Sequence, residues 1–332
     1  MSWGEVRAAR TAHEASLFSR ANVVGVAVGQ KVIHGHGTDE PCVVVYVERK
    51  RPEAELRRRD IVPKVLTGVR TDVVETGRFA ARELVNRAAV DRTERIRPAP
   101  GGVSIAHERV TAGTLGVLAT RDGHTVILSN NHVLANENDA RPGDAILQPG
   151  PADGGRPIDE IARLEDFVPI AFNQRNLGAF GRFLERLLGP LLALLGLQLK
   201  RLPKETLNIV DAAIAAPLSE DLIDPRILEI GLVGGIADPV VGMGARKSGR
   251  TTGLTSGRIT GLDAVVEVDY GNRSAVFRQQ IVCDLLSRGG DSGSLVVDGE
   301  NRAIGLLFAG GATTTLVNPI DDVVRALKLT LR

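Results

Sequence analysis

Residues 287–297 read SRGGDSGSLVV, and they place Ser292 in a glycine-rich turn directly before a valine-containing apolar run. A serine hydroxyl is a weak nucleophile until a neighbouring base takes its proton. Glycines beside it allow backbone conformations that residues with a Cβ rarely adopt, so backbone N–H groups can converge on a developing oxyanion. The stretch predicts Ser292 as a nucleophile, with the N–H groups of Gly290 and Ser292 as the oxyanion hole.

Two upstream segments supply a base and an acid. Residues 127–136 read ILSNNHVLAN, in which a strand-like run ends in a turn that carries His132. Imidazole suits the role of base because its pKa lies near neutral pH. Residues 208–215 read NIVDAAIA and place Asp211 in an apolar run, where an unpaired carboxylate would be costly. A buried carboxylate fixes the tautomer of such a histidine, so we predict a triad of His132, Asp211 and Ser292. Three other acids between the histidine and the serine remain alternatives to Asp211: Asp139, Asp144 and Asp166.

These motifs resemble those of chymotrypsin-like serine peptidases. GGDSGSL is similar to the nucleophile motif of that family, and SNNHVL is similar to its histidine motif. The chain order His, Asp, Ser is also the order of that family, whereas subtilisins and α/β-hydrolases use other orders. The run GRTTGLTSGRI resembles a hairpin of bacterial members, and the resemblance covers roughly residues 103–325. The whole chain is similar to cytoplasmic bacterial trypsin-like proteins and their plant narrow-leaf relatives.

The resemblance implies a fold, a reaction and a substrate pocket. The fold would be a chymotrypsin-like double antiparallel β-barrel, and the reaction would be hydrolysis of a protein or peptide through an acyl-enzyme, without a cofactor. The pocket would have Leu286 at its floor and Phe308, Ala309 and Gly310 along its wall. An apolar floor beside a glycine-containing wall favours cleavage after small or medium apolar side chains.

The sequence departs from the family pattern at two places in the nucleophile motif. Ser294 stands where the family usually has a glycine, a small change that the turn should tolerate. Asp291 in many relatives pairs with a freshly cleaved N-terminus. A long segment precedes the barrel here, so we do not expect that activation switch.

The pattern of short segments agrees with a mainly β fold and divides the chain in two. From residue 99 onward, β-like runs alternate with Gly, Asp and Asn, which favours an antiparallel barrel over a βαβ sheet. Residues 1–98 read as a small α+β module with a regulatory or assembly role, and the charged stretch 91–102 reads as a linker. Residues 99–332 form the predicted peptidase domain, with a helical insertion near 172–205. A helix is expected at the C-terminal end, with one apolar face: Ile320, Val323, Val324 and Leu327.

Composition excludes several other classes of function. Lys and Arg number 41 against 40 Asp and Glu, so no basic field is available to hold a nucleic acid. The two cysteines, Cys42 and Cys283, have no metal-ligand spacing and suit a reducing compartment. The run VGMGARKSG lacks the glycine that a phosphate loop needs before its lysine, because Arg246 stands there. We predict neither a metal nor a nucleotide site.

The same reading predicts a cytoplasmic protein. No apolar core of signal-peptide length lies near the N-terminus. The most apolar run, LLGPLLALLGLQL, is too short and too broken to cross a bilayer, which takes about 20 apolar residues. That run is a candidate membrane-surface anchor, oligomer contact or lid over the cleft, or else a helix packed on the barrel. Exposed apolar patches usually mark contacts, so self-association is expected.

Two alternatives to a constitutive peptidase remain open. In the first, the barrel is only a scaffold for binding or assembly, since a fold does not fix a function. In the second, the peptidase is latent, and the N-terminal module gates its cleft.

Overall fold

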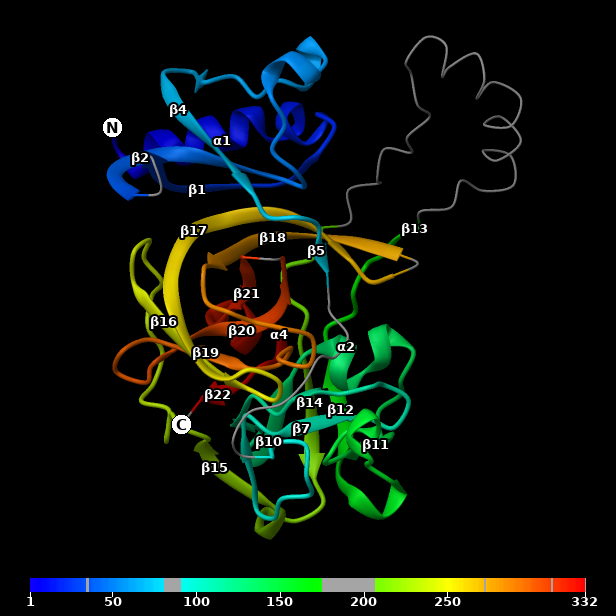
Figure 1. Cartoon of the computed structure of the whole chain (residues 1–332). Helices are drawn as coiled ribbons and strands as arrows, with labels where there is room; N and C mark the ends of the chain where they lie inside the picture. Colours follow the sequence, from blue (N-terminus) through cyan, green and yellow to red (C-terminus); the bar gives the residue numbers. More distant parts are fainter. Residues whose placement is uncertain (34–35, 81–90, 175–206, 272, 312, 332) are drawn as a thin grey trace, which may run out of the picture.

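The computed structural model describes residues 1–33, 36–80, 91–174, 207–271, 273–311 and 313–331 (Figure 1). Within these ranges the chain is mainly β, with a helix near each end, α1 (Trp3–Phe18) and α4 (Ile320–Leu327). The predicted fold class, with its small N-terminal α+β module and C-terminal helix, is confirmed. Most of the helical insertion predicted near residues 172–205 lies outside the described residues.

The first sheet contains the strand that precedes His132 and the strand that follows Asp211. It has eight strands in the order β22-β9-β10-β14-β12-β11-β7-β8, and its neighbouring strands run antiparallel. The last strand of the chain, β22, lies at one edge, beside β9. The bounds are β7 (Ser104–His107), β8 (Gly113–Thr114), β9 (Val117–Arg121), β10 (His124–Ser129), β11 (Ala145–Leu147), β12 (Glu160–Phe167), β14 (Ala213–Pro217) and β22 (Thr330–Leu331).

The second sheet carries the serine and extends into the N-terminal module. Its order is β13-β18-β21-β20-β19-β16-β17-β1-β2-β4-β3, and β5 pairs separately with β17 and β20. β18 also pairs with β17, so strands β16 to β21 curl back on themselves. The bounds are β1 (Val23–Ile33), β2 (His36–Val47), β3 (Val65–Leu66), β4 (Val69–Glu75), β5 (Phe79–Ala80), β13 (Asn173–Gln174), β16 (Gly244–Gly249), β17 (Gly253–Asp269), β18 (Arg273–Cys283), β19 (Leu295–Val297), β20 (Ala303–Gly310) and β21 (Thr315–Pro319).

The long strand β17 joins the N-terminal module to the barrel, as the arch in Figure 1 shows. Its pairing with β18 shifts register three times, between Ile259 and Val266. Such bulges bend a strand and increase its twist. Gly261 lies in the bent part, where a Cβ would come within 2.7 Å of the Tyr46 hydroxyl. The bend lets one strand pair with β16 at one end and with β1 at the other.

The N-terminal module is bound to the barrel by backbone pairing. β1 pairs antiparallel with β17, for example Gly25 with Val266. The helix α1 packs against β1 and β2. A capping box between Ser2 and Glu5 closes the first turn of this helix. Val6, Ala9 and Leu17 of α1 are buried in the apolar cluster that it shares with these strands. The domain boundary near residue 98 stays a prediction.

The stretch 91–102, expected to be a linker, packs against the barrel. Arg92 is only 2% exposed, and its guanidinium donates to the Gly102 carbonyl and to Ser248 Oγ and pairs with Glu229. β6 (Ala99–Gly101) pairs in parallel with β15 (Ile223–Ile227). The charge and the prolines of residues 91–102 predicted a linker, but the buried Arg92 has partners from distant parts of the chain, Ser248 and Glu229.

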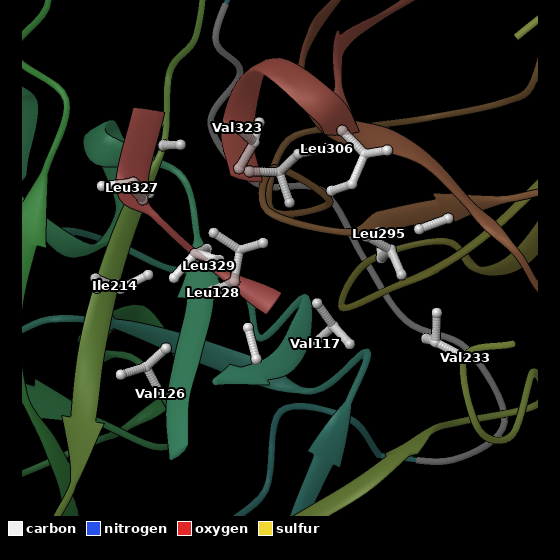
Figure 2. Packing of buried hydrophobic residues seen from close by; sticks show 14 of the residues in the cluster. Val117, Val126, Leu128, Ile214, Val233, Leu295, Leu306, Val323, Leu327 and Leu329 are labelled. Carbon is white, nitrogen blue, oxygen red and sulfur yellow. The ribbon is translucent and has the colours of Figure 1, made fainter. Parts of the chain in front are cut away.

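One apolar core lies between the two sheets (Figure 2). The first sheet contributes Leu128 and Ile214, the second contributes Leu295 and Leu306, and α4 adds Val323 among others. Fully burying a side chain of this size stabilises a fold by roughly 1.5–3 kcal/mol. Ile320, Val323 and Leu327 are buried, and Val324 packs partly against the cluster, so the apolar face predicted for this helix is confirmed. The core fixes the two sheets against each other, and with them the segments that carry the histidine and the serine.

Candidate active site

His132 and Asp211 meet at the end of the first sheet. His132 lies in the short helix α2 (Asn131–Leu134), which begins two residues after β10 ends, and Asp211 lies two residues before β14 begins. Since β10 and β14 are paired neighbours, the two residues come together. His132 Nδ1 lies 2.6 Å from Asp211 Oδ2, and the backbone N–H of His132 donates to Asp211 Oδ1 at 3.2 Å. The carboxylate thus holds both the ring and the backbone of the histidine.

A buried amide network holds the backbone around Asp211. Asn318 Oδ1 accepts from the Asp211 N–H at 3.0 Å, and the Asn130 side-chain amide donates to the Asp211 carbonyl at 2.7 Å. Gln280 receives a hydrogen bond from Asn318 and donates to the Ile209 carbonyl. These hydrogen bonds hold the backbone of Asp211 in place, while the buried Asn130 Oδ1 has no hydrogen-bond partner within the described residues.

The environment of His132 favours the charged imidazolium. The side chain is 12% exposed and that of Asp211 is 0% exposed. Burial disfavours the charged form, but the charge of Asp211 and its hydrogen bond outweigh burial, so the pKa of His132 is raised above its ordinary value of 6.5. Since a carboxylate can only accept, Nδ1 carries the proton, which leaves Nε2 free to act as a base.

Ser292 lies in a tight turn before β19, and it is 5% exposed. Gly293 follows at φ +94°, and a Cβ there would collide with Ser129 Oγ and the Thr114 carbonyl. The glycine is therefore required by both conformation and space. Ser294, in place of the usual family glycine, donates from its hydroxyl to the Asp291 carbonyl at 2.6 Å, so the turn accommodates the change.

The strand β8 links the serine turn to the histidine helix. The Thr114 N–H donates to the Ser292 carbonyl at 2.8 Å, and Gly113 packs directly against the side chain of Val133. The Ser292 hydroxyl makes a long hydrogen bond, 3.4 Å, to the Phe308 carbonyl, and in the described structure it makes none to His132. Without a substrate, catalytic hydrogen bonds are often long or misaligned, and a rotation about one side-chain bond re-aims a serine hydroxyl.

The predicted oxyanion donors are the backbone N–H groups of Gly290 and Ser292. Across the described residues, neither the Gly290 N–H nor the Ser292 N–H donates a hydrogen bond, whereas the N–H groups of Asp291, Gly293 and Ser294 all do. Gly290 has φ +90°, a conformation that suits glycine.

Asp291 is anchored by a lysine of the same chain. Lys247 Nζ lies 3.4 Å from Asp291 Oδ2, and both side chains are 0% exposed. The carboxylate also accepts from the N–H groups of Thr251, Thr252 and Arg288. Burial lowers the pKa of Lys247, and the charge of Asp291 opposes that shift. Asp291 therefore has a cationic partner within the chain, and the expectation that no cleaved N-terminus is needed stays a prediction.

The three alternative acids pair with other side chains. Asp144 pairs with His107 and Arg109, Asp166 pairs with Arg121, and Asp139 lies 3.5 Å from Arg273. The geometry thus favours Asp211 as the partner of His132.

The residues predicted to line the pocket are not equally accessible. Leu286 is 51% exposed, whereas Phe308 and Ala309 are buried. Gly310 is paired antiparallel with Ala80 of β5, so a segment of the N-terminal module lies along the predicted wall strand.

The structure adds two residues that the sequence interpretation missed, Lys247 and Tyr270. In the sequence, Lys247 stands in the run VGMGARKSG, which resembles only an incomplete phosphate loop. Its proximity to the nucleophile motif follows from the pairing of β16 with β19. Tyr270 lies in the turn after β17 and donates to Asp211 Oδ2. No local signal marks it, because the contact joins segments far apart in the chain.

The described residues hold no cluster of metal-ligating side chains, and their two cysteines are free and buried. Among the helices that the structure describes, none combines the length and the apolar character needed to cross a bilayer.

Residues 4–75 match the model of the NARROW LEAF 1 N-terminal domain. Streptogrisin-A from Streptomyces griseus is 34% identical over 96 residues, which cover 27% of this chain and 31% of that protein. The chain therefore matches about a third of the length of that relative.

Several solved structures are similar to part of this chain. Cellulomonas bogoriensis chymotrypsin is 16% identical, with a TM-score of 0.43, and the match covers 70% of this chain and 97% of that one. Thermobifida fusca protease A is 16% identical, with a TM-score of 0.44 and coverage of 70% and 96%. The streptogrisin-A match supports a relation to the trypsin-like serine peptidases over part of the chain, and residues 4–75 are similar to the NARROW LEAF 1 N-terminal domain.

Proposed function

We propose that this protein is a serine endopeptidase that uses His132, Asp211 and Ser292 as a catalytic triad. The observation that carries the proposal is the pair of buried Asp211 and largely covered His132, 2.6 Å apart, at the end of the sheet whose Thr114 N–H donates to the Ser292 carbonyl. The N–H groups of Gly290 and Ser292, which donate to none of the described residues, support it, since a scaffold has no need of unpaired amides beside a buried serine.

The proposed reaction proceeds through an acyl-enzyme. His132 Nε2 takes the proton of Ser292 as the hydroxyl attacks the peptide carbonyl, and the carbonyl oxygen becomes an oxyanion held by two backbone N–H groups. One such donor contributes roughly 3–4 kcal/mol of transition-state stabilisation. The imidazolium then protonates the leaving amine, and the C–N bond breaks. Water repeats the sequence on the ester and releases the acid and the free serine.

Substrate preference is proposed from the pocket floor. Leu286 presents an exposed apolar side chain six residues before the nucleophile. Such a floor favours small or medium apolar side chains at P1 over basic ones. The cytoplasmic location and the self-association expected from the sequence stay predictions.

The test of this proposal is hydrolysis of a peptide library followed across pH. We expect cleavage after uncharged residues, with kcat/KM rising with pH to a midpoint above about 6.5. Protonated His132 cannot accept the serine proton, and Asp211 raises the pKa of that histidine, so activity is lost as pH falls through the raised value. A strong preference for Arg or Lys would contradict the pocket assignment. A midpoint well below pH 6 would contradict the role of the pair.

A latent peptidase is the second candidate, and one observation favours it. Extended peptides commonly bind by adding a strand to a sheet edge. The edge of β20 at Gly310 is already paired with Ala80, and the Thr76 carbonyl lies directly against Gly311. Phe79 of the same segment is buried against Phe308 and its neighbours. A peptide reaching this edge would have to displace β5.

The substitution Ala80→Pro tests latency, because proline cannot donate a backbone hydrogen bond at this edge. If β5 blocks the site, we expect kcat/KM for an extended peptide to rise several-fold. A short ester that occupies only the S1 pocket should be cleaved at an unchanged rate. If the variant cleaved the extended peptide no faster than the parent protein does, gating by β5 would be rejected.

A further inference from the structure

The Asp211 carboxylate has a third donor besides the two groups of His132. The Tyr270 hydroxyl donates to Asp211 Oδ2 at 2.8 Å, and the same oxygen receives His132 Nδ1 at 2.6 Å. The other oxygen, Oδ1, receives the backbone N–H of His132. Within the described structure these are all the hydrogen bonds that the carboxylate accepts. Among the described residues, Tyr270 is thus the one donor to Asp211 Oδ2 that does not belong to His132.

The ring of Tyr270 is held in place on several sides. It lies edge-on to His132, with centroids 6.0 Å apart, and edge-on to Phe172, with centroids 5.3 Å apart. Phe277 packs against it at 6.4 Å, and Tyr270 is 8% exposed. The guanidinium of Arg273 lies over the ring of Phe172, 4.0 Å from its centroid. Packing rather than solvent therefore decides where the hydroxyl points.

The hydroxyl has the right protonation state for a donor. Burial, and then the charge of Asp211, raise the pKa of Tyr270 well above its ordinary value. The phenol stays protonated at neutral pH, and the carboxylate can only accept. A hydrogen bond to a charged group is stronger than one between neutral groups.

We propose that Tyr270 is a positioning residue of the triad: its hydroxyl fixes Asp211 Oδ2 so that the carboxylate holds the His132 ring in the orientation needed for proton transfer. The inference rests on the proposed function. Two donors to Oδ2 from different directions, together with one to Oδ1, leave the carboxylate no freedom to rotate about its side-chain bond. Removing the phenol leaves Oδ2 with the imidazole alone, so the carboxylate and the ring can move together.

Tyr270→Phe tests the role because it removes only the hydroxyl and keeps the ring that packs on Phe172 and Phe277. We expect kcat to fall about tenfold to a hundredfold, the range for losing a hydrogen bond to a charged group, while KM stays unchanged. The chain has one other tyrosine, Tyr46, which is also buried but packs against Phe79. Tyr46→Phe is therefore the matched control, and it should leave kcat unchanged.

A second readout does not depend on turnover. The proton between His132 Nδ1 and Asp211 should give a low-field NMR resonance in the full-length protein. We expect Tyr270→Phe to shift or broaden this resonance and Tyr46→Phe to leave it in place. An unchanged kcat together with an unchanged resonance in Tyr270→Phe would overturn the inference, as would an equal loss in both variants. If the parent protein cleaves nothing while the resonance still responds to Tyr270→Phe, the proposed function fails and the positioning contact stands.

Discussion

Replacing Ser292 with alanine should lower kcat about a million-fold, the loss typical of removing the nucleophile of a serine peptidase. Without the hydroxyl no acyl-enzyme forms, and only substrate binding and the oxyanion donors still favour the reaction. Alanine fits the turn, because the Ser292 hydroxyl makes only one long hydrogen bond, to the Phe308 carbonyl. Initial rates on a cleaved peptide, measured for both proteins at the same pH, give the ratio.

Ser294→Ala is the control for that experiment. Ser294 lies in the same turn and is buried, but its hydroxyl donates to the Asp291 carbonyl and serves the structure of the loop. We expect a change of no more than a few-fold. If Ser292→Ala kept the activity of the parent protein, the assignment of the nucleophile would be wrong.

Replacing Asp211 with asparagine should lower kcat about ten-thousand-fold. The amide is the same size, but it no longer stabilises the imidazolium, and its NH₂ group favours the tautomer with the proton on Nε2. Because the charge of Asp211 raises the pKa of His132, its removal should move the acid limb of the residual kcat/KM profile to lower pH. The measurement is a pH–rate profile of the variant beside that of the parent.

Asp144→Asn is the matched control for the acid. Asp144 also contacts a histidine, His107, yet it pairs with Arg109 as well and has no contact with His132 in the described structure. We expect this variant to keep kcat within a few-fold. A large loss in Asp144→Asn with little loss in Asp211→Asn would reverse the assignment.

The triad candidates could be predicted because each lies in a local context that sequence displays. His132 follows a β-like run, Asp211 interrupts an apolar one, and Ser292 stands among glycines. Their order along the chain, His, Asp, Ser, then matches the order of the family that the motifs resemble. Lys247 and Tyr270 have no such context, because their roles depend on which strands pair. The pairing of β16 with β19 brings Lys247 to Asp291, and the end of β17 brings Tyr270 to Asp211.

The N-terminal module shows the same limit in another way. The sequence predicted a small α+β module here, but the pattern of a strand does not tell which sheet edge that strand joins. β1 pairs with β17 and β5 pairs with Gly310, so the module is continuous with the second sheet. Arg92, in a stretch that composition predicted as a linker, is buried because Glu229 and Ser248 receive its guanidinium.

The most direct test is covalent labelling of the full-length protein with a fluorophosphonate, followed by mass spectrometry of the digested chain. Such reagents modify a serine hydroxyl that a neighbouring base has activated. We expect one adduct, on the peptide that contains Ser292, and we expect Asp211→Asn to slow its formation strongly. Labelling at another residue, or none in either the parent protein or Ala80→Pro, would contradict the claim that His132, Asp211 and Ser292 act together.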